Sequence, residues 1–164
     1  MNAEKSPFLD PFKRYQVKQP TIAMFGIHIH PIGMEQTLDV VHECIISKQS
    51  LHVGMLNAAK VVNMKRNPAL GADVTSSNLI LADGSAVVMA SKILNKKLPE
   101  RVAGIDLMHG ILERGNTAGY RVFCLGATEE VSGEIERQIK KHYPGVIIAG
   151  RQNGYFSEEE QQQV

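Results

Sequence analysis

The sequence predicts an α/β fold with Rossmann-like alternation of strands and helices and a mostly parallel sheet. Short apolar runs typical of strands recur along the chain, and segments with apolar residues at helical spacing separate them. The separating segments have the length that a crossover between parallel strands requires. Glycine follows several of the apolar runs, as at Gly84 and Gly126, which is typical of strand-to-helix turns in such folds.

The expected strands are residues 21–25, 27–32, 51–55, 78–82, 121–125 and 146–149. The expected helices are residues 34–48, 57–66, 85–94, 105–114 and 128–139. Gly26 separates the first two extended segments, which can therefore form a hairpin. Asn57 can cap the second helix, and Asn67 with Pro68 interrupts that helix.

The second half of the pattern has clearer boundaries. Asp83 and Gly84 follow the fourth apolar run at once, where a buried strand must end. Gly126 closes the fifth strand, and Thr128 has the side chain to cap the helix after it. Gly150 is expected to end the last strand.

Both ends of the chain differ from this pattern. Residues 1–20 contain three prolines and no period, which predicts a flexible N-terminal arm whose aromatic residues could dock on a core or a partner. Residues 21–164 are then expected to form the α/β domain. Ser157 and Glu160 fit a capping box that opens a helix, but only four residues follow Glu160. We therefore expect the domain to be truncated at its C-terminus.

Composition excludes several classes of protein. The formal charge of +1, from 18 basic and 17 acidic residues, gives no electrostatic case for nucleic acid as a partner. No apolar run is long enough to cross a bilayer, and no export leader opens the chain. Cys44 and Cys124 lie far apart among apolar neighbours, so we interpret them as buried free thiols.

The strand ends carry the candidate ligand contacts, because ligands of parallel α/β sheets bind outside the carboxyl ends of the strands. The turn at Gly126 suits a diphosphate, or it only reverses the chain. The three-glycine dinucleotide fingerprint is absent, so no nicotinamide or flavin cofactor is expected. Asp83 could be a general base, or it could cap the next helix by accepting from the Ser85 and Ala86 amides.

Two further sets of residues allow a functional and a structural interpretation. Arg101 offers a planar fork of donors to a phosphate or carboxylate, but it could equally form a surface ion pair with Asp106. His28 and His30 would lie on one face of a strand. Two imidazoles alone make no metal centre, and no third ligand accompanies them, so no metal is expected.

Five motifs in order carry a resemblance to a known family. They are Asn57, Leu81-Ala82-Asp83-Gly84, Leu98-Pro99-Glu100-Arg101-Val102-Ala103-Gly104-Ile105-Asp106-Leu107, Val122-Phe123-Cys124-Leu125-Gly126 and Asn153-Gly154-Tyr155-Phe156. The series resembles the WecG/TagA/CpsF family of bacterial glycosyltransferases over residues 22–156. The long central motif is the most specific part of this resemblance.

The resemblance implies an inverting glycosyltransferase. The family moves N-acetylmannosamine or a related sugar from a UDP donor to a polyprenyl-diphosphate-linked sugar acceptor, in polysaccharide or wall-polymer synthesis. It works at the cytoplasmic face of the plasma membrane and needs neither an essential metal nor another cofactor. By match to its motifs, Asp83 would be the general base. The matching substrate-binding positions would be Asn57, Gly84, Arg101, Gly104, Asp106 and Gly126.

Two departures leave alternatives open. The family usually has threonine where Met55 stands, and a thioether cannot replace a hydroxyl donor. The family also continues beyond this length with a further active-site motif and a basic appendage. A non-catalytic UDP-sugar-binding or assembly module is therefore the alternative, and an unrelated nucleotide-binding domain is a third. Apolar helices left uncovered would favour a homo-oligomer. The sugar and the acceptor stay open.

Overall fold

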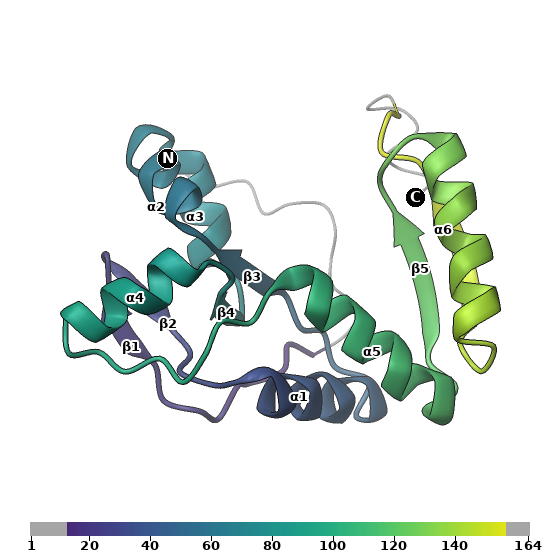
Figure 1. The fold of residues 1–164 in the computed structure, drawn as a ribbon, viewed down its shortest axis with the longest axis horizontal. Coiled ribbons are helices and arrows are strands. Elements are labelled where there is room, and N and C mark those ends of the chain that lie inside the picture. Colours follow the sequence, from purple (N-terminus) through teal and green to yellow (C-terminus); the bar gives the residue numbers. More distant parts are fainter. Residues whose placement is uncertain (1–12, 157–164) are drawn as a thin grey trace. The chain divides into compact units, whose positions relative to one another are not determined.

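The computed structural model describes residues 13–156, and within them it confirms the α/β class (Figure 1). Residues 1–12 of the expected arm and the helix start at Ser157 lie outside the described residues. The strands are β1 (Ile22–Met24), β2 (Ile27–Ile29), β3 (Val53–Leu56), β4 (Leu79–Ala82), β5 (Arg121–Leu125) and β6 (Ile147–Gln152). The helices are α1 (Met34–Ile46), α2 (Ala58–Arg66), α3 (Pro68–Thr75), α4 (Ser85–Ile93), α5 (Gly104–Ala118) and α6 (Glu129–His142).

The chain forms two compact units, Met1–Leu107 and Met108–Val164, with the boundary inside α5. In the first unit β1 and β2 form an antiparallel hairpin, and β3 pairs with β4 in parallel. In the second unit β5 pairs with β6 in parallel. Two of the three strand pairs are thus parallel, as the helical crossovers predict.

The core of the first unit surrounds the apolar strand β4, whose four residues are all buried. Leu56 of β3 and Ile29 of β2 are fully buried in the same core. His30 joins β2 to β4, because its backbone N–H donates to the Ile80 carbonyl at 2.9 Å and its Nδ1 accepts from the Ile80 N–H at 3.1 Å. This histidine is therefore a core residue, and burial lowers the pKa of its imidazole.

The helix α3 is absent from the sequence prediction. Asn67 and Pro68 are predicted to interrupt the second helix, and α2 does end at Arg66. Pro68 then occupies the first turn of a new helix. Proline is well suited to that position because its missing N–H has no intrahelical partner there. Asn67 serves both helices: its N–H donates to Asn63 of α2, and its Oδ1 accepts from the Leu70 N–H of α3 at 3.2 Å.

The last strand is longer than expected. Gly150 lies inside β6 and does not end it, so the prediction of a strand end at Gly150 is wrong. Pairing explains the extension: β6 follows β5 to Leu125 through a register shift between Val122 and Phe123. Gly150 stands opposite Phe123, where a methyl group would lie 2.8 Å from Cε2 of the ring. Glycine therefore makes room for the ring and lets the strand continue.

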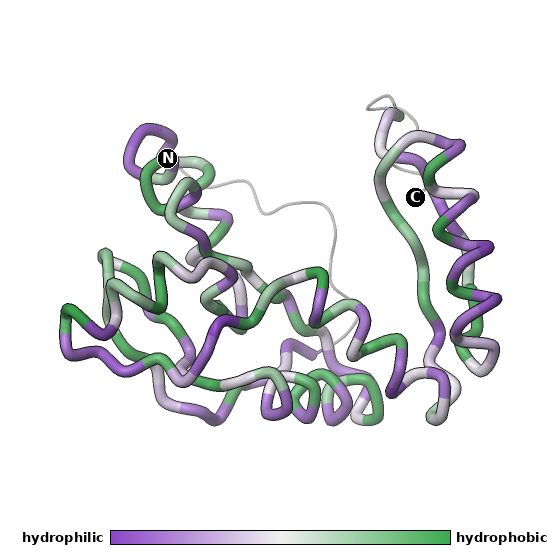
Figure 2. The backbone as a smooth tube through the Cα atoms, viewed as in Figure 1, coloured by the Kyte–Doolittle hydropathy of each residue, from purple (hydrophilic) through white to green (hydrophobic). Residues whose placement is uncertain are grey.

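The two faces of the second unit's strand pair differ. Val122, Cys124 and Ile148 pack with Leu112 and Ile139 in a small core. Their neighbours along the strands are exposed, among them Phe123, Leu125 and Ile147. In Figure 2 much of β5 is green, the colour of hydrophobic residues. These strand residues are exposed apolar surface. The expectation of self-association is based on uncovered apolar helices, and it stays a prediction.

Residues 13–15 run beside the end of α1. Tyr15 donates its N–H to the Ser50 carbonyl at 2.8 Å, and the Ser50 N–H donates to Lys13 at 3.1 Å. The Tyr15 ring is buried, and its hydroxyl donates to Glu43 at 2.8 Å. Both cysteines are free, with Cys44 buried and Cys124 half-buried, and burial raises the pKa of each thiol. Among residues 13–156 no helix has the length and apolar character of a membrane span.

Candidate functional site

The candidate site lies at the carboxyl ends of β3 and β4. The parallel register sets Leu56 opposite Ala82, so Asn57 and Asp83 leave the sheet at the same edge. The Asp83 N–H donates to the Leu56 carbonyl at 2.9 Å and prolongs this pairing by one step. Two polar side chains that are 26 residues apart in the sequence are thereby brought side by side.

Asp83 is half-buried, and its carboxylate is held by a distant part of the chain. Oδ1 accepts from the backbone N–H of Gly104 at 3.2 Å. The helix cap that local reasoning offers as the alternative is not formed: Gly84 is the N-cap residue of α4, and no side chain caps that helix. The carboxylate is thus oriented by the first residue of α5, while its second oxygen has no protein donor among the described residues.

Asn57 and Gly84 form the floor of the site. Asn57 caps α2, since its Oδ1 accepts from the Lys60 N–H at 2.9 Å. Within the described part of the chain its side-chain amide group donates to no protein atom, so that donor is available to a ligand. A methyl group at Gly84 would lie 3.3 Å from Cβ of Asn57, tighter than ordinary packing. Glycine at this position favours the close approach of the two strand-end loops.

Residues 98–104 pass beside this edge. Leu98, Val102 and Ala103 are buried, and the Val102 N–H donates to the Ala82 carbonyl at 2.9 Å. This bond brings Gly104 to Asp83. Gly104 also lies beside Met55 of β3: a methyl group added at Gly104 would be 3.7 Å from Cγ of Met55. The thioether therefore stands beside the candidate site, where the resemblance leads one to expect a hydroxyl.

Arg101 and Asp106 are paired with each other. Nη2 of Arg101 lies 3.3 Å from Oδ2 of Asp106, and the two side chains are 50% and 57% exposed. This is the surface ion pair that sequence reasoning weighed against ligand binding. An exposed pair of this kind is weak, so a phosphate or carboxylate of a ligand could replace Asp106 at little cost.

Gly126 belongs to the second unit and is described with its own neighbours. Its φ of +122° and the φ of +60° at Ala127 turn the chain sharply after β5. The Gly126 N–H donates to Gln152 at 2.9 Å, and the Gly154 N–H donates to Ala127 at 2.8 Å. Thr128 caps α6, as predicted, with its Oγ1 accepting from the Val131 N–H.

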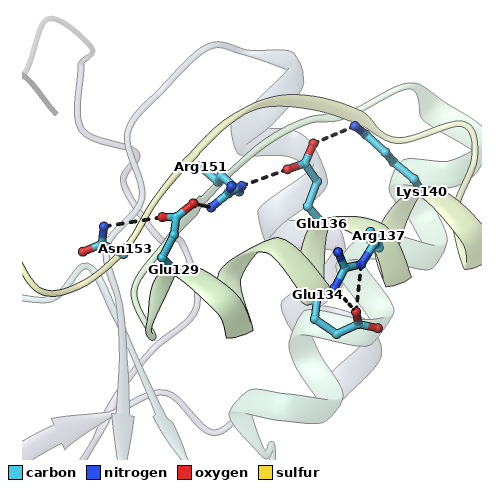
Figure 3. Close-up of polar contacts among 7 residues, drawn as sticks. All are labelled: Glu129, Glu134, Glu136, Arg137, Lys140, Arg151 and Asn153. Atoms are coloured by element: carbon cyan, nitrogen blue, oxygen red, sulfur yellow. Dashed lines mark hydrogen bonds and ion pairs between the residues drawn. The ribbon is translucent and has the colours of Figure 1, made fainter.

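The first turn of α6 carries two carboxylates, Glu129 and Glu130. Figure 3 shows Glu129 paired with Arg151 of β6, which also binds Glu136 at 3.0 Å. The hydrogen bond that Arg151 donates to the Glu129 carboxylate is the main reason why the pKa of Arg151 is raised. A diphosphate at this helix N-terminus would meet negative charge that is already in place there.

The site residues named from the sequence therefore fall into three groups. Asn57, Asp83, Gly84 and Gly104 converge at one edge of β3 and β4. Arg101 and Asp106 form an exposed pair beside them. Gly126 shapes a turn of the second unit. Throughout residues 13–156, no cluster of three or more potential metal ligands occurs.

Two features of the site were missed by sequence reasoning. Gly104 acts on Asp83 through its amide, and Glu100 binds the N-terminus of α1. Backbone donors leave no trace in residue type, so the first had no signal. Glu100 had no local signal either, because it is an exposed charged residue between Pro99 and Arg101, which are also exposed.

Comparison with known proteins adds independent findings. The model of the glycosyl transferase WecG/TagA/CpsF family matches residues 22–164. An N-acetylglucosaminyldiphosphoundecaprenol N-acetyl-beta-D-mannosaminyltransferase of Bacillus spizizenii is 38% identical over 94 residues, which are 57% of this chain and 37% of that protein. A protein of the same name from Bacillus subtilis is 38% identical over 85 residues, 52% of this chain and 33% of that protein. The chain thus matches about a third of the length of either relative.

Proposed function

Because the chain belongs to the WecG/TagA/CpsF family of glycosyl transferases, we propose that it contributes the donor side of an inverting glycosyltransferase. The transferred group is an N-acetylmannosamine-like or glucose-like sugar, and the donor is a UDP-sugar. The acceptor is a sugar linked to a polyprenyl diphosphate, by analogy with the names of the two relatives. A lipid-linked acceptor favours work at the cytoplasmic face of the membrane, in the synthesis of an envelope polymer.

One observation carries the proposal: a half-buried carboxylate stands at the carboxyl end of β4, oriented by a backbone N–H and flanked by an unengaged amide group. Asp83 takes the proton of the acceptor hydroxyl. The hydroxyl oxygen bonds to the anomeric carbon, and the bond from that carbon to the UDP oxygen breaks, with the electron pair leaving on UDP. Asn57 and Arg101 are proposed to hold the sugar and the phosphates. Gly126 is proposed to lie near the nucleotide.

The test is substitution of Asp83 by asparagine in the full-length protein, measured by UDP release and transfer to a prenyl-diphosphate-linked N-acetylglucosamine. We expect kcat to fall by about 10²- to 10⁴-fold, the usual contribution of a general base. Asp73→Asn, at an exposed aspartate of α3, is the matched control and keeps full turnover. Undiminished turnover by the Asp83 variant would remove the base assignment.

The position of Met55 supports a second candidate, a UDP-sugar-binding or assembly module without chemistry. Met55 brings an apolar group to the edge where Asp83 would act. Calorimetric titration with UDP, UDP-N-acetylmannosamine and UDP-glucose, with NAD as control, distinguishes the enzyme from the binding module when a turnover assay accompanies it. Binding with turnover supports the enzyme, and binding without turnover supports the module. Binding of NAD alone contradicts both.

A further inference from the structure

The loop that orients Asp83 is itself attached to α1 through a carboxylate. Oε1 of Glu100 accepts from the backbone N–H of Met34, in the first turn of α1, at 2.7 Å. Gly33, the N-cap residue of α1, has no side chain to do this, and a Cβ at Gly33 would collide with the Glu100 carboxylate. A negative charge at a helix N-terminus is also favoured by the helix dipole. Glu100 thus caps a helix from 66 residues away.

The same loop is attached to the rest of the first unit at points on either side of Glu100. Before it, the Leu98 N–H donates to Oγ of the buried Ser91 at 3.3 Å. After it, the Val102 N–H donates to Ala82, and the Gly104 N–H donates to Asp83. Only three residues separate Glu100 from Gly104. Glu100 and the amide that holds the Asp83 carboxylate therefore belong to one short segment, with the bond from Val102 to Ala82 between them.

We propose that Glu100 is a positioning residue for the reaction at Asp83. Its bond to the N-terminus of α1 sets the path of residues 98–104 along β4, and this path places the Gly104 N–H on Oδ1 of Asp83. With one oxygen fixed in this way, the other oxygen keeps the direction needed to accept a proton from the sugar hydroxyl. This inference rests on the proposed function of Asp83.

A purely structural role makes a different prediction. If Glu100 only capped α1, its loss would lower the melting temperature, as for other helix caps, and would leave the rate of transfer unchanged. Asn67 provides the matched comparison, because its Oδ1 caps α3 by the same kind of bond, and it takes no part in the site. Asn67→Ala removes a helix cap without touching the loop.

The experiment compares kcat and the KM for the UDP-sugar in the full-length wild type, Glu100→Ala, Glu100→Gln and Asn67→Ala. We expect Glu100→Ala to lower kcat about tenfold, within the range known for small displacements of a catalytic group, and to leave KM within about twofold. Glu100→Gln keeps an Oε1 acceptor and should restore most of kcat. Asn67→Ala should melt earlier and turn over at the wild-type rate.

Three results would overturn the proposal. They are a wild-type kcat in Glu100→Ala, a loss in Glu100→Gln as large as in Glu100→Ala, or an equal loss in Asn67→Ala. Amide hydrogen exchange at Gly104 supplies a readout independent of activity. It should be faster in Glu100→Ala and unchanged in Asn67→Ala, and equal protection in wild type and Glu100→Ala would also overturn the proposal.

The exchange measurement separates this inference from the proposed function. A wild-type protein without transfer would refute the proposed function, while faster exchange at Gly104 in Glu100→Ala would still support the attachment of the loop. Active wild type with unchanged exchange and kcat in Glu100→Ala would refute the positioning role alone.

Discussion

His30 offers a stringent test of the packing between β2 and β4. Its imidazole is 8% exposed, and Nδ1 accepts from the Ile80 N–H, which requires Nδ1 to be unprotonated. Replacement by phenylalanine would leave the buried Ile80 N–H without an acceptor. An unsatisfied buried donor costs about 1–3 kcal/mol, so we expect the free energy of unfolding to fall by that amount at pH 7.5. His30→Asn, which retains an acceptor oxygen, should lose less.

The pH dependence follows from the same burial. Since burial lowers the pKa of folded His30, the unfolded chain binds the proton at a higher pH than the folded protein does. The unfolded state then carries more protons below about pH 6.5, and stability falls as the pH falls through that value. His30→Asn and His30→Phe lack this contribution, so their stability should change less between pH 7.5 and 5.5.

Urea unfolding at the two pH values, followed by circular dichroism, measures both effects. His52→Asn is the control, because His52 is exposed on the surface of the same unit. It should reproduce the pH dependence of the wild type. A His30→Phe variant within about 0.5 kcal/mol of wild type at pH 7.5 would contradict the cost assigned to the Ile80 N–H. Equal pH dependence in wild type and His30→Asn would contradict the role of burial.

Two further predictions concern polar contacts elsewhere. Arg151→Met removes the ion pairs from β6 to Glu129 and Glu136 of α6, so the melting temperature should fall. The fall should be smaller in 1 M salt, because the Glu129 side chain is 63% exposed and its pair is screened, whereas the half-buried pair with Glu136 is screened less. An equal fall at low and high salt would contradict this. Burial, aided by the bond to Glu43, raises the pKa of Tyr15 to about 12. Because an unfolded tyrosine titrates near 10, wild-type stability should fall between about pH 10 and 12, and Tyr15→Phe should lack this part of the fall in urea unfolding.

The catalytic reading of Asp83 shows how far residue patterns reach. The apolar run before it predicts a buried strand, and the following glycine predicts its end, so the position of Asp83 at a strand end follows from local sequence alone. The same holds for Asn57 and Thr128, which cap the helices after them as predicted. These features depend on a few neighbouring residues, and short-range sterics and hydrogen bonding are sufficient to produce them.

Other features required contacts between distant segments. The N–H that holds Asp83 comes from Gly104, 21 residues later, and the carboxylate that caps α1 comes from Glu100. Neither pairing has a local signal, since a backbone donor looks the same at every residue. Gly150 inside β6 is a further case, because strand pairing with β5 overrides the tendency of glycine to end a strand.

The sequence by itself thus determined the alternation of strands and helices apart from α3, the strand end before Asp83 and the resemblance to a family, all of which depend on residue type and spacing. Tertiary structure alone decided that β6 continues through Gly150, that His30 bonds to Ile80, and which groups face Asp83. The physical reason is that hydrogen bonds and packing between distant segments depend on how the chain folds back on itself, and the pattern of neighbouring residues does not contain that information.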